Sequence, residues 1–289
     1  MKKLVQVVSI FVLLIALTAC ANSATSVMTI INQVAYHPQM PVEQRHLRVG
    51  VVAGPYGSMF MEGIYPALSA QGYTVELVMF DDFIQPNQSL ANGSTDLNIF
   101  QHNNFLNNFK FEHGVELSAI AEVPTVSMGV FSHVYNSLED ISTGAVVAIP
   151  ADDTNLTRAL RVLQAAGLIG FNPQADITRV TASDIDRNPR GLVFVPVEAS
   201  QLVSELNNHD MAVITGGFAF AEGLDIAGAL YNEVLSDGLL IVVTVRTEDL
   251  ARDFVGDILD VIHSDRFKSV IVDQASPYSG FQRPRYFFQ

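Results

Sequence analysis

The order of apolar runs along the chain is the feature that most constrains its fold. Short valine-rich runs, typical of buried strands, alternate with segments of helical spacing, beginning with a strand at 47–52 and a helix at 59–71. Further strands are expected at 73–80, 96–100, 117–123, 127–132, 145–149, 177–180, 192–197, 211–215 and 239–245. Further helices are expected at 85–92, 103–112, 154–166, 200–207 and 248–263. This alternation predicts βαβ units and parallel sheets, hence an α/β fold.

The strand–helix units fall into two groups, about 47–126 and 145–215, followed by a last strand and helix that need a sheet to join. A chain of 289 residues has room for about two domains of roughly 150 residues each. Two α/β lobes create a cleft, and ligands of such folds bind at the carboxyl ends of strands. We therefore expect a small-molecule site between two lobes.

Composition excludes several classes of protein. A net charge of −14 argues against a nucleic-acid binder and against adhesion to anionic lipid. One cysteine excludes an internal disulfide framework and a Cys-rich zinc site. Adjacent carboxylates at Asp81–Asp82 and Asp152–Asp153 stand at expected loop or helix starts, where capping is favoured over metal binding. Phosphate-binding, dinucleotide-binding and catalytic motifs are missing from the sequence, so we expect no enzyme activity, no cofactor and no metal.

The first twenty residues are typical of an export signal. Two lysines precede an apolar run at 7–17, whose helix of about 16 Å is too short for a bilayer core of about 30 Å. The following Leu-Thr-Ala-Cys resembles a bacterial lipobox, in which the cysteine is lipidated and the chain is cut before it. We expect a signal peptide at 1–19, a lipidated Cys20 with a tether at 20–46, and a lipoprotein anchored in the cell envelope on its periplasmic or extracellular face. An incidental cysteine after an ordinary signal is the alternative.

One candidate site segment is Phe-Gln-His-Asn-Asn-Phe-Leu at 100–106, where a strand ends and a helix begins. Phe100, His102 and Phe105 would line an apolar pocket with one polar group. Two core phenylalanines and a solvated histidine explain the pattern equally well.

The second candidate segment is the start of the helix at 154–166. Asn155 and Arg158 are three residues apart and share one helix face. A helix N-terminus offers free N–H groups, and a guanidinium one turn further fits a carboxylate. These groups predict a site for a small anion, against the alternative of a surface arginine.

At these residues the sequence resembles the methionine-binding lipoprotein family, the substrate-binding proteins of methionine-type ABC importers. The resemblance extends from 47 to at least 265 and is carried by LRVGVVAGP, VELVMFDDFIQPNQSLANGSTDLNIFQHNNFL and SLEDISTGAVVAIPADDTNLTRALRVLQAAGLI. It implies the type II periplasmic binding protein fold, with two α/β lobes joined by hinge strands around the ligand cleft. We assign 47–126 and 237–289 to lobe 1, and 127–236 to lobe 2.

The resemblance also implies residue roles. Arg158 would grip the α-carboxylate of the ligand with Asn155 nearby, and Phe100, His102 and Phe105 would line the cleft. Phe105 stands where the family usually has tyrosine, so a hydroxyl contact is missing.

Several other positions depart from the family together. Thr215 replaces an asparagine that contacts the ligand, Val126 replaces a tyrosine, and Glu122 replaces an asparagine, where a carboxylate would face an ammonium group or solvent. The segment at 238–242 lacks the usual tyrosine and asparagine. Since an unpaired buried polar group costs about 1–3 kcal/mol, these changes would abolish methionine binding or mark a different ligand.

The sequence therefore predicts a lipid-anchored, monomeric solute-binding protein of an ABC importer. Its expected partners are a small amino acid, methionine or an analogue, and a permease with its ATPase. The alternative is an orphan binding lipoprotein of the same fold whose ligand is changed or lost. An enzyme on this fold is disfavoured because no acid–base or nucleophile constellation is present.

Overall fold

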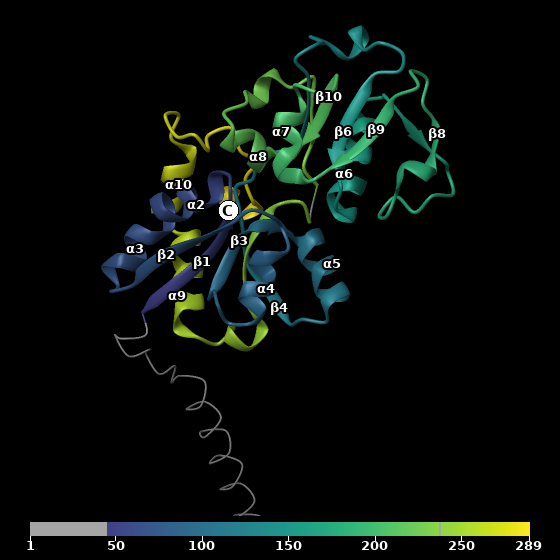
Figure 1. Cartoon of the computed structure of the whole chain (residues 1–289). Helices are drawn as coiled ribbons and strands as arrows, with labels where there is room; N and C mark the ends of the chain where they lie inside the picture. The colour runs from purple at the N-terminus through teal and green to yellow at the C-terminus, as the bar shows by residue number, and fades with distance from the viewer. Residues whose placement is uncertain (1–44, 237) are drawn as a thin grey trace, which may run out of the picture. The chain divides into compact units, whose positions relative to one another are not determined.

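The computed structural model describes residues 45–236 and 238–289, and the predicted signal peptide, Cys20 and most of the tether lie outside them. All the described residues belong to one compact unit. Within that unit two five-stranded sheets carry helices on their faces (Figure 1). The α/β class expected from the alternation of strands and helices is confirmed.

The first sheet has the strand order β2-β1-β3-β12-β4. β1 runs parallel to β2 and β3, whereas β12 is antiparallel to both β3 and β4. The strands are β1 (His46–Val52), β2 (Thr74–Phe80), β3 (Leu97–His102), β4 (Leu117–Val123) and β12 (Ile241–Arg246).

The second sheet repeats this arrangement in the order β11-β5-β10-β6-β9. β6 is parallel to β9 and β10, and β5 is antiparallel to β10 and β11. Its strands are β5 (Gly129–Phe131), β6 (Val146–Pro150), β9 (Val193–Val197), β10 (Met211–Ile214) and β11 (Tyr231–Asn232). In each sheet one antiparallel strand, β12 or β5, lies next to the three parallel strands. Each of these two strands begins where the chain arrives from the other sheet. The boundaries assigned to the lobes, after 126 and after 236, stay a prediction.

The helices follow the strands in chain order. The first sheet is accompanied by α2 (Pro55–Met59), α3 (Tyr65–Ala70), α4 (Gln85–Ala91), α5 (Asn103–His113), α9 (Asp253–His263) and α10 (Asp265–Val272). The second sheet is accompanied by α6 (Asp153–Ala165), α7 (Leu202–Glu205) and α8 (Gly216–Ala221). A separate two-stranded sheet pairs β7 (Gly170–Phe171) with β8 (Ile185–Arg187).

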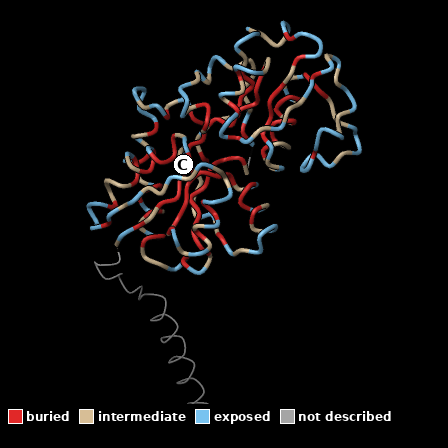
Figure 2. Tube along the Cα trace, viewed as in Figure 1, coloured by how far each residue is buried: buried red, intermediate tan, exposed pale blue. Residues whose placement is uncertain are grey.

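The central strands are buried on both faces, including the polar Asn98, Gln101 and His102 of β3. Every residue of β3, β10 and β12 is buried, and Figure 2 shows buried chain along the sheets with exposed chain in the outer loops. Parallel strands covered by helices have no solvent face, so continuous apolar runs are the expected sequence pattern. The core strands were therefore the easiest elements to predict.

The strand expected at 177–180 is wrong. Asp176 accepts hydrogen bonds from the backbone N–H and the hydroxyl of Thr178, and Ile177 is 50% exposed. The side chain of Asp176 bonds the backbone two residues further on and so stabilises a turn, which outweighs the strand preference of three β-branched residues that have no sheet to join.

The helix expected at 59–71 is not one regular helix. A π-helical segment at Phe60–Ile64 separates α2 from α3, and the N–H of Tyr65 bonds the carbonyl of Phe60. Pro66 has no N–H to offer the preceding turn, which accounts for the altered hydrogen-bond pattern at this point. The helix expected at 248–263 begins only at Asp253, and α8 and α10 were not predicted.

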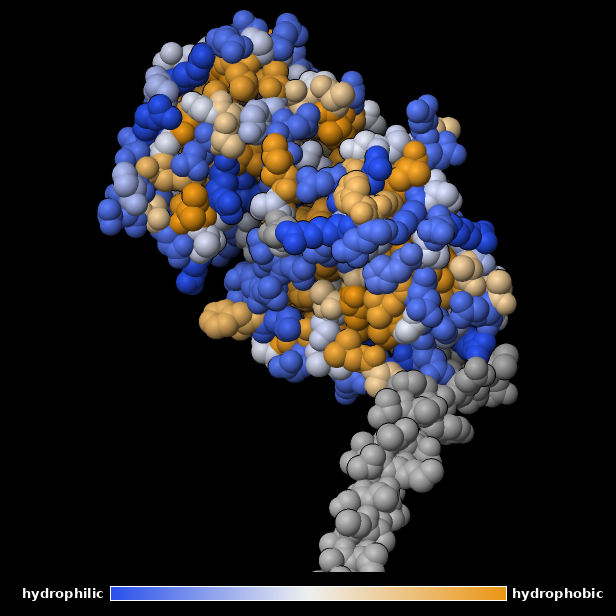
Figure 3. Space-filling model, turned by 180° about the vertical axis from the view of Figure 1, so that it is seen from behind, coloured by the Kyte–Doolittle hydropathy of each residue, from blue (hydrophilic) through white to orange (hydrophobic). Residues whose placement is uncertain are grey.

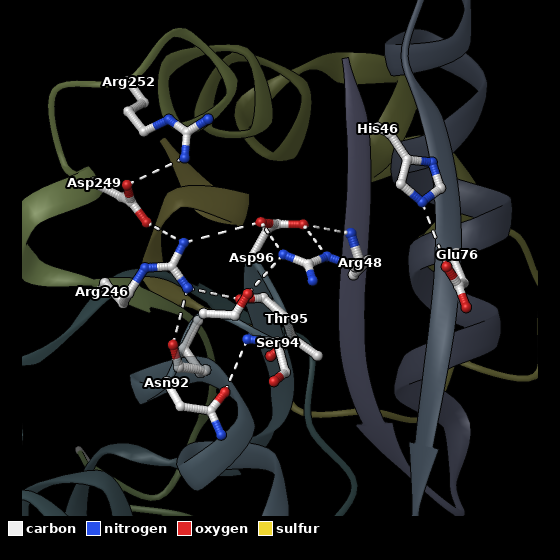
Figure 4. A network of polar contacts seen from close by, with 12 residues as sticks. His46, Arg48, Glu76, Asn92, Ser94, Thr95, Asp96, Arg246, Asp249 and Arg252 are labelled. Carbon is white, nitrogen blue, oxygen red and sulfur yellow. Dashed lines mark hydrogen bonds and ion pairs between the residues drawn. The ribbon is translucent and has the colours of Figure 1, made fainter. Parts of the chain in front are cut away.

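Charged side chains connect the last residue of β12, Arg246, to neighbouring segments at one end of the first sheet (Figure 4). The buried Arg246 donates from Nη1 to the carbonyl oxygens of Leu90 at 2.9 Å and Thr95 at 2.7 Å, and it pairs with Asp249. Asp96 accepts from Arg48 and lies 3.9 Å from Arg246. The network joins the end of β12 to the loop between α4 and β3.

The exposed surface mixes polar and apolar residues. Figure 3 shows apolar areas among polar residues on one face of the molecule. Single exposed apolar side chains are ordinary on soluble surfaces. Among the described residues, no helix is both long enough and apolar enough to span a bilayer.

We predict that Arg246→Met lowers the free energy of unfolding by about 3–5 kcal/mol, because it leaves buried carboxylates and carbonyls without their donor. Urea denaturation of the purified body measures the change. Arg266→Met, on the exposed side of α10, is the control and should stay within about 0.5 kcal/mol of the parent. A small change at Arg246 would mean that the network contributes little to stability.

Candidate ligand-binding site

A pocket lies where the carboxyl ends of strands from both sheets meet. Its lining comes from the turn after β1, the end of β3, the first turns of α5 and α6, and the turn between β10 and α8. Its volume is about 40 Å³, and it adjoins an open groove of about 930 Å³. His102 and Arg158 line both spaces, so they stand at the boundary between pocket and groove.

Seven of the eight residues expected to contact a ligand line this one pocket. They are Phe100, His102, Phe105, Val126, Asn155, Arg158 and Thr215. Residues from both sheets and from distant parts of the sequence are thus brought together. Their contact with a ligand stays a prediction.

Glu122 is the exception among the expected contacts. It lies on β4 opposite Val242, its carbonyl accepts from the Tyr286 hydroxyl at 3.1 Å, and it does not line the pocket. Burial, and secondly the negative charge of the Glu122 carboxylate, raises the pKa of Tyr286. The structure therefore places Glu122 beside the C-terminal segment.

The start of α6 positions the first polar group of the pocket. Asp152 caps the helix by accepting from the Asn155 N–H at 2.9 Å, and the Asn155 amide donates to both Asp152 oxygens at 3.1 Å. The capping role expected for this aspartate pair is confirmed for Asp152. One turn later Arg158 is buried, with its side chain 9% exposed. The alternative of a surface arginine is thus wrong.

Arg158 has an acidic partner that the sequence reading missed. Its Nε lies 3.0 Å and 3.1 Å from the two carboxylate oxygens of Glu233, and its Nη2 lies 2.6 Å from Oε2. Glu233 also accepts from the Met128 N–H at 3.2 Å, and its side chain is only 8% exposed. The two residues are 75 positions apart in the chain, and no local pattern connects them.

His102 supplies a second polar group. Its Nδ1 accepts from the Phe105 N–H at 3.1 Å and so caps α5. Burial, and secondly the positive charge of Arg158, lowers the pKa of His102 to about 3. The ring is therefore neutral with its proton on Nε2. This buried N–H makes no hydrogen bond of normal geometry within the described residues, and the nearby Asn155 side chain is a third, opposing influence that raises the pKa.

Thr215 supplies a third polar group. It precedes α8, its side chain is buried, and its hydroxyl oxygen has no partner within the described chain. The next residue, Gly216, packs so closely on the Val126–Ser127 backbone that an added Cβ would collide with the Ser127 carbonyl oxygen. A glycine is required here for the turn to approach the neighbouring segment.

Phenylalanine rings form the apolar part of the pocket. Phe83 lies 6.0 Å from Phe100, 5.9 Å from Phe105 and 5.3 Å from Phe218 between ring centroids. Phe83 and Phe218 were not expected to belong to the site. Their positions, after β2 and within the unpredicted α8, give no periodic signal.

The low pKa of His102 predicts a pH dependence of stability. The unfolded chain binds a proton near pH 6.5 and the folded chain only near 3, so stability falls as the pH drops through this interval. The slope from this residue is at most about 1.4 kcal/mol per pH unit. It should disappear in His102→Gln and persist in His133→Gln, an exposed position, when urea denaturation is repeated from pH 4 to 8. Equal slopes in all three proteins would contradict the neutral buried histidine.

Two sheets of identical strand order with a shared pocket at their strand ends define a bilobed solute-binding protein. Comparison with known sequences gives the family. The NlpA lipoprotein family matches residues 47–285, and the chain belongs to this family. The expected resemblance is thereby confirmed: its members are substrate-binding proteins of transporters and not enzymes.

Similar sequences carry lipoprotein names. The chain is 31% identical to the D-methionine-binding lipoprotein MetQ of Yersinia pestis, over 68% of this chain and 70% of the relative. It is 34% identical to outer membrane lipoprotein 3 of Mannheimia haemolytica, over 62% of this chain and 67% of the relative.

Similar solved structures share the bilobed fold. The substrate-binding protein of a methionine transporter from Streptococcus pneumoniae superposes with a TM-score of 0.76 at 29% identity, covering 83% of this chain and 96% of that chain. A nutrient-binding protein from Burkholderia cenocepacia bound to methionine gives a TM-score of 0.74 at 30% identity, covering 79% and 96%.

Proposed function

We propose that this protein is the lipid-anchored substrate-binding protein of an ABC importer, and that it binds methionine or a similar amino acid. The observation that carries the proposal is the convergence of Arg158 and the unpartnered Nε2–H of His102 at one end of a phenylalanine-lined pocket. Related proteins named for methionine binding support the choice of ligand.

The polar end of the pocket suits a carboxylate. A guanidinium has five N–H donors, and Glu233 engages only Nε and Nη2 of Arg158. The remaining N–H groups, together with the His102 Nε2–H, are donors for the ligand carboxylate. The unpartnered hydroxyl of Thr215 offers an acceptor for the ligand ammonium group.

The apolar end of the pocket suits an unbranched, polarisable side chain. Four phenylalanine rings surround it, and sulfur–aromatic contacts stabilise a thioether by about 0.3–1.5 kcal/mol. The pocket is small beside the adjoining groove, at about 40 Å³ against about 930 Å³, and His102 and Arg158 stand between the two spaces. A ligand would enter from the groove past these two side chains.

We predict that Arg158→Met weakens amino-acid binding at least about 30-fold, because truncating one partner of a buried charged contact costs 2–5 kcal/mol. Calorimetric titration of the purified body with L- and D-methionine and other amino acids measures the affinities. Arg158→Lys, which keeps the charge and loses the planar fork, should show a smaller loss.

Arg161→Met is the matched control, because Arg161 lines the groove and not the pocket. Its affinity should equal that of the parent. Unchanged affinity in Arg158→Met would contradict the carboxylate role. A folded parent protein that binds no amino acid would contradict the proposed transport function.

The anchor and the permease belong to the same proposal. Cys20, which lies outside the described residues, follows an apolar run of signal-peptide length. We predict that Cys20→Ser moves the full-length protein from the membrane fraction to the soluble fraction of cells, since the lipid is lost. Fractionation and immunoblotting measure the shift, and Ser26→Ala is the control that should stay in the membrane fraction. Membrane retention of Cys20→Ser would contradict the lipid anchor.

A further inference from the structure

The buried ion pair between Arg158 and Glu233 has consequences beyond holding a ligand. Both side chains are less than one-tenth exposed; Arg158 lies on α6, and Glu233 directly follows β11 of the second sheet. Glu233 follows β11, whose pairing with β5 is extended by the hydrogen bond from the Glu233 N–H to the Met128 carbonyl. The position of Glu233 is therefore set by backbone pairing on the same side of the site as Arg158.

The Arg158 guanidinium contacts the Glu233 carboxylate, and Arg158 also lines the pocket. Glu233 lies against the Nε–Nη2 edge and lines the groove, whereas Arg158 alone of the two lines the pocket. The opposite edge of the guanidinium is thus available to a ligand while the pair stays intact. Glu233 need not be displaced when a ligand binds.

The pair also determines the charge of the site. Among the described residues that line the pocket, Arg158 is the one with a formal charge, since His102 is neutral. The carboxylate of Glu233 cancels that charge within hydrogen-bond distance. An anion entering the pocket would lose its water against a site of zero net charge, which is unfavourable. A zwitterion has no net charge, so the occupied site stays neutral, and its ammonium group can donate to the unpartnered Thr215 hydroxyl.

We infer that Glu233 is a specificity-determining residue: by holding and neutralising Arg158, it makes the pocket select zwitterionic amino acids over simple carboxylate anions. The inference rests on the proposed amino-acid site for its ligand class. The counter-ion role of Glu233 can be tested without an amino acid.

The first experiment compares two ligands that differ only in the ammonium group, methionine and 4-(methylthio)butanoate, by calorimetric titration. The parent protein should prefer methionine at least tenfold. In Glu233→Gln the ratio of the two affinities should fall at least tenfold, because the uncompensated guanidinium now attracts the anion. Glu112→Gln, at an exposed position of the same groove, should keep the parent ratio.

The second experiment needs no amino acid. Acetate is titrated into the protein and the melting temperature is recorded, since a ligand that binds the folded state alone raises it. Acetate should stabilise Glu233→Gln in a saturable manner, with little effect on the parent or on the double variant Arg158→Met/Glu233→Gln. A matched sodium chloride series separates binding from ionic strength.

The outcomes separate the two proposals. Equal binding of both ligands by the parent, or an unchanged ratio in Glu233→Gln, overturns the selectivity role, and the first of these outcomes does so even where the variant does not fold. Acetate stabilisation of Glu233→Gln without amino-acid binding by the parent refutes the proposed ligand but supports the counter-ion role. Amino-acid binding without acetate stabilisation of the variant refutes the counter-ion role.

Discussion

The buried pair of Arg158 and Glu233 is the interaction on which the rest of the site depends. A guanidinium at this depth needs a counter-charge, because removing an ion from water costs several kcal/mol. Glu233 provides it by contacting Nε and Nη2 of Arg158, while Arg158 also lines the pocket. The same ion pair therefore compensates the buried charge and holds the arginine at the site.

The remaining polar groups of the pocket are made available by helix caps. His102 uses Nδ1 to cap α5, which leaves the proton on Nε2, and this N–H makes no hydrogen bond of normal geometry among the described residues. Asp152 caps α6 and holds Asn155 and the first turn in place. Both helices start where β3 and β6 end, so the side chains that cap them lie at the strand ends where the pocket is.

The residues expected to differ from the family pattern do not all lie in this pocket. Phe105, Val126 and Thr215 line it, whereas Glu122 does not. Phe105 lies beside His102, with ring centroids 6.4 Å apart. Thr215 is followed by Gly216, Gly217 and Phe218, which line the pocket with it. The expected departures are therefore found on both sides of the site.

The sequence by itself determined the α/β class, the core strands and seven of the pocket residues, because apolar periodicity and motif resemblance are local properties of the chain. It failed where the deciding contact is distant or local bonding outweighs composition. Asp176 stabilises a turn where a strand was expected, and a π-helical segment at Phe60–Ile64 interrupts the regular helix expected at 59–71. Glu233, Phe83 and Phe218 entered the site, and Glu122 left it, only through tertiary structure. The reason is physical: strand order and pairing of β5 with β11 bring residues 75 positions apart into hydrogen-bond contact, and no local sequence pattern records that distance.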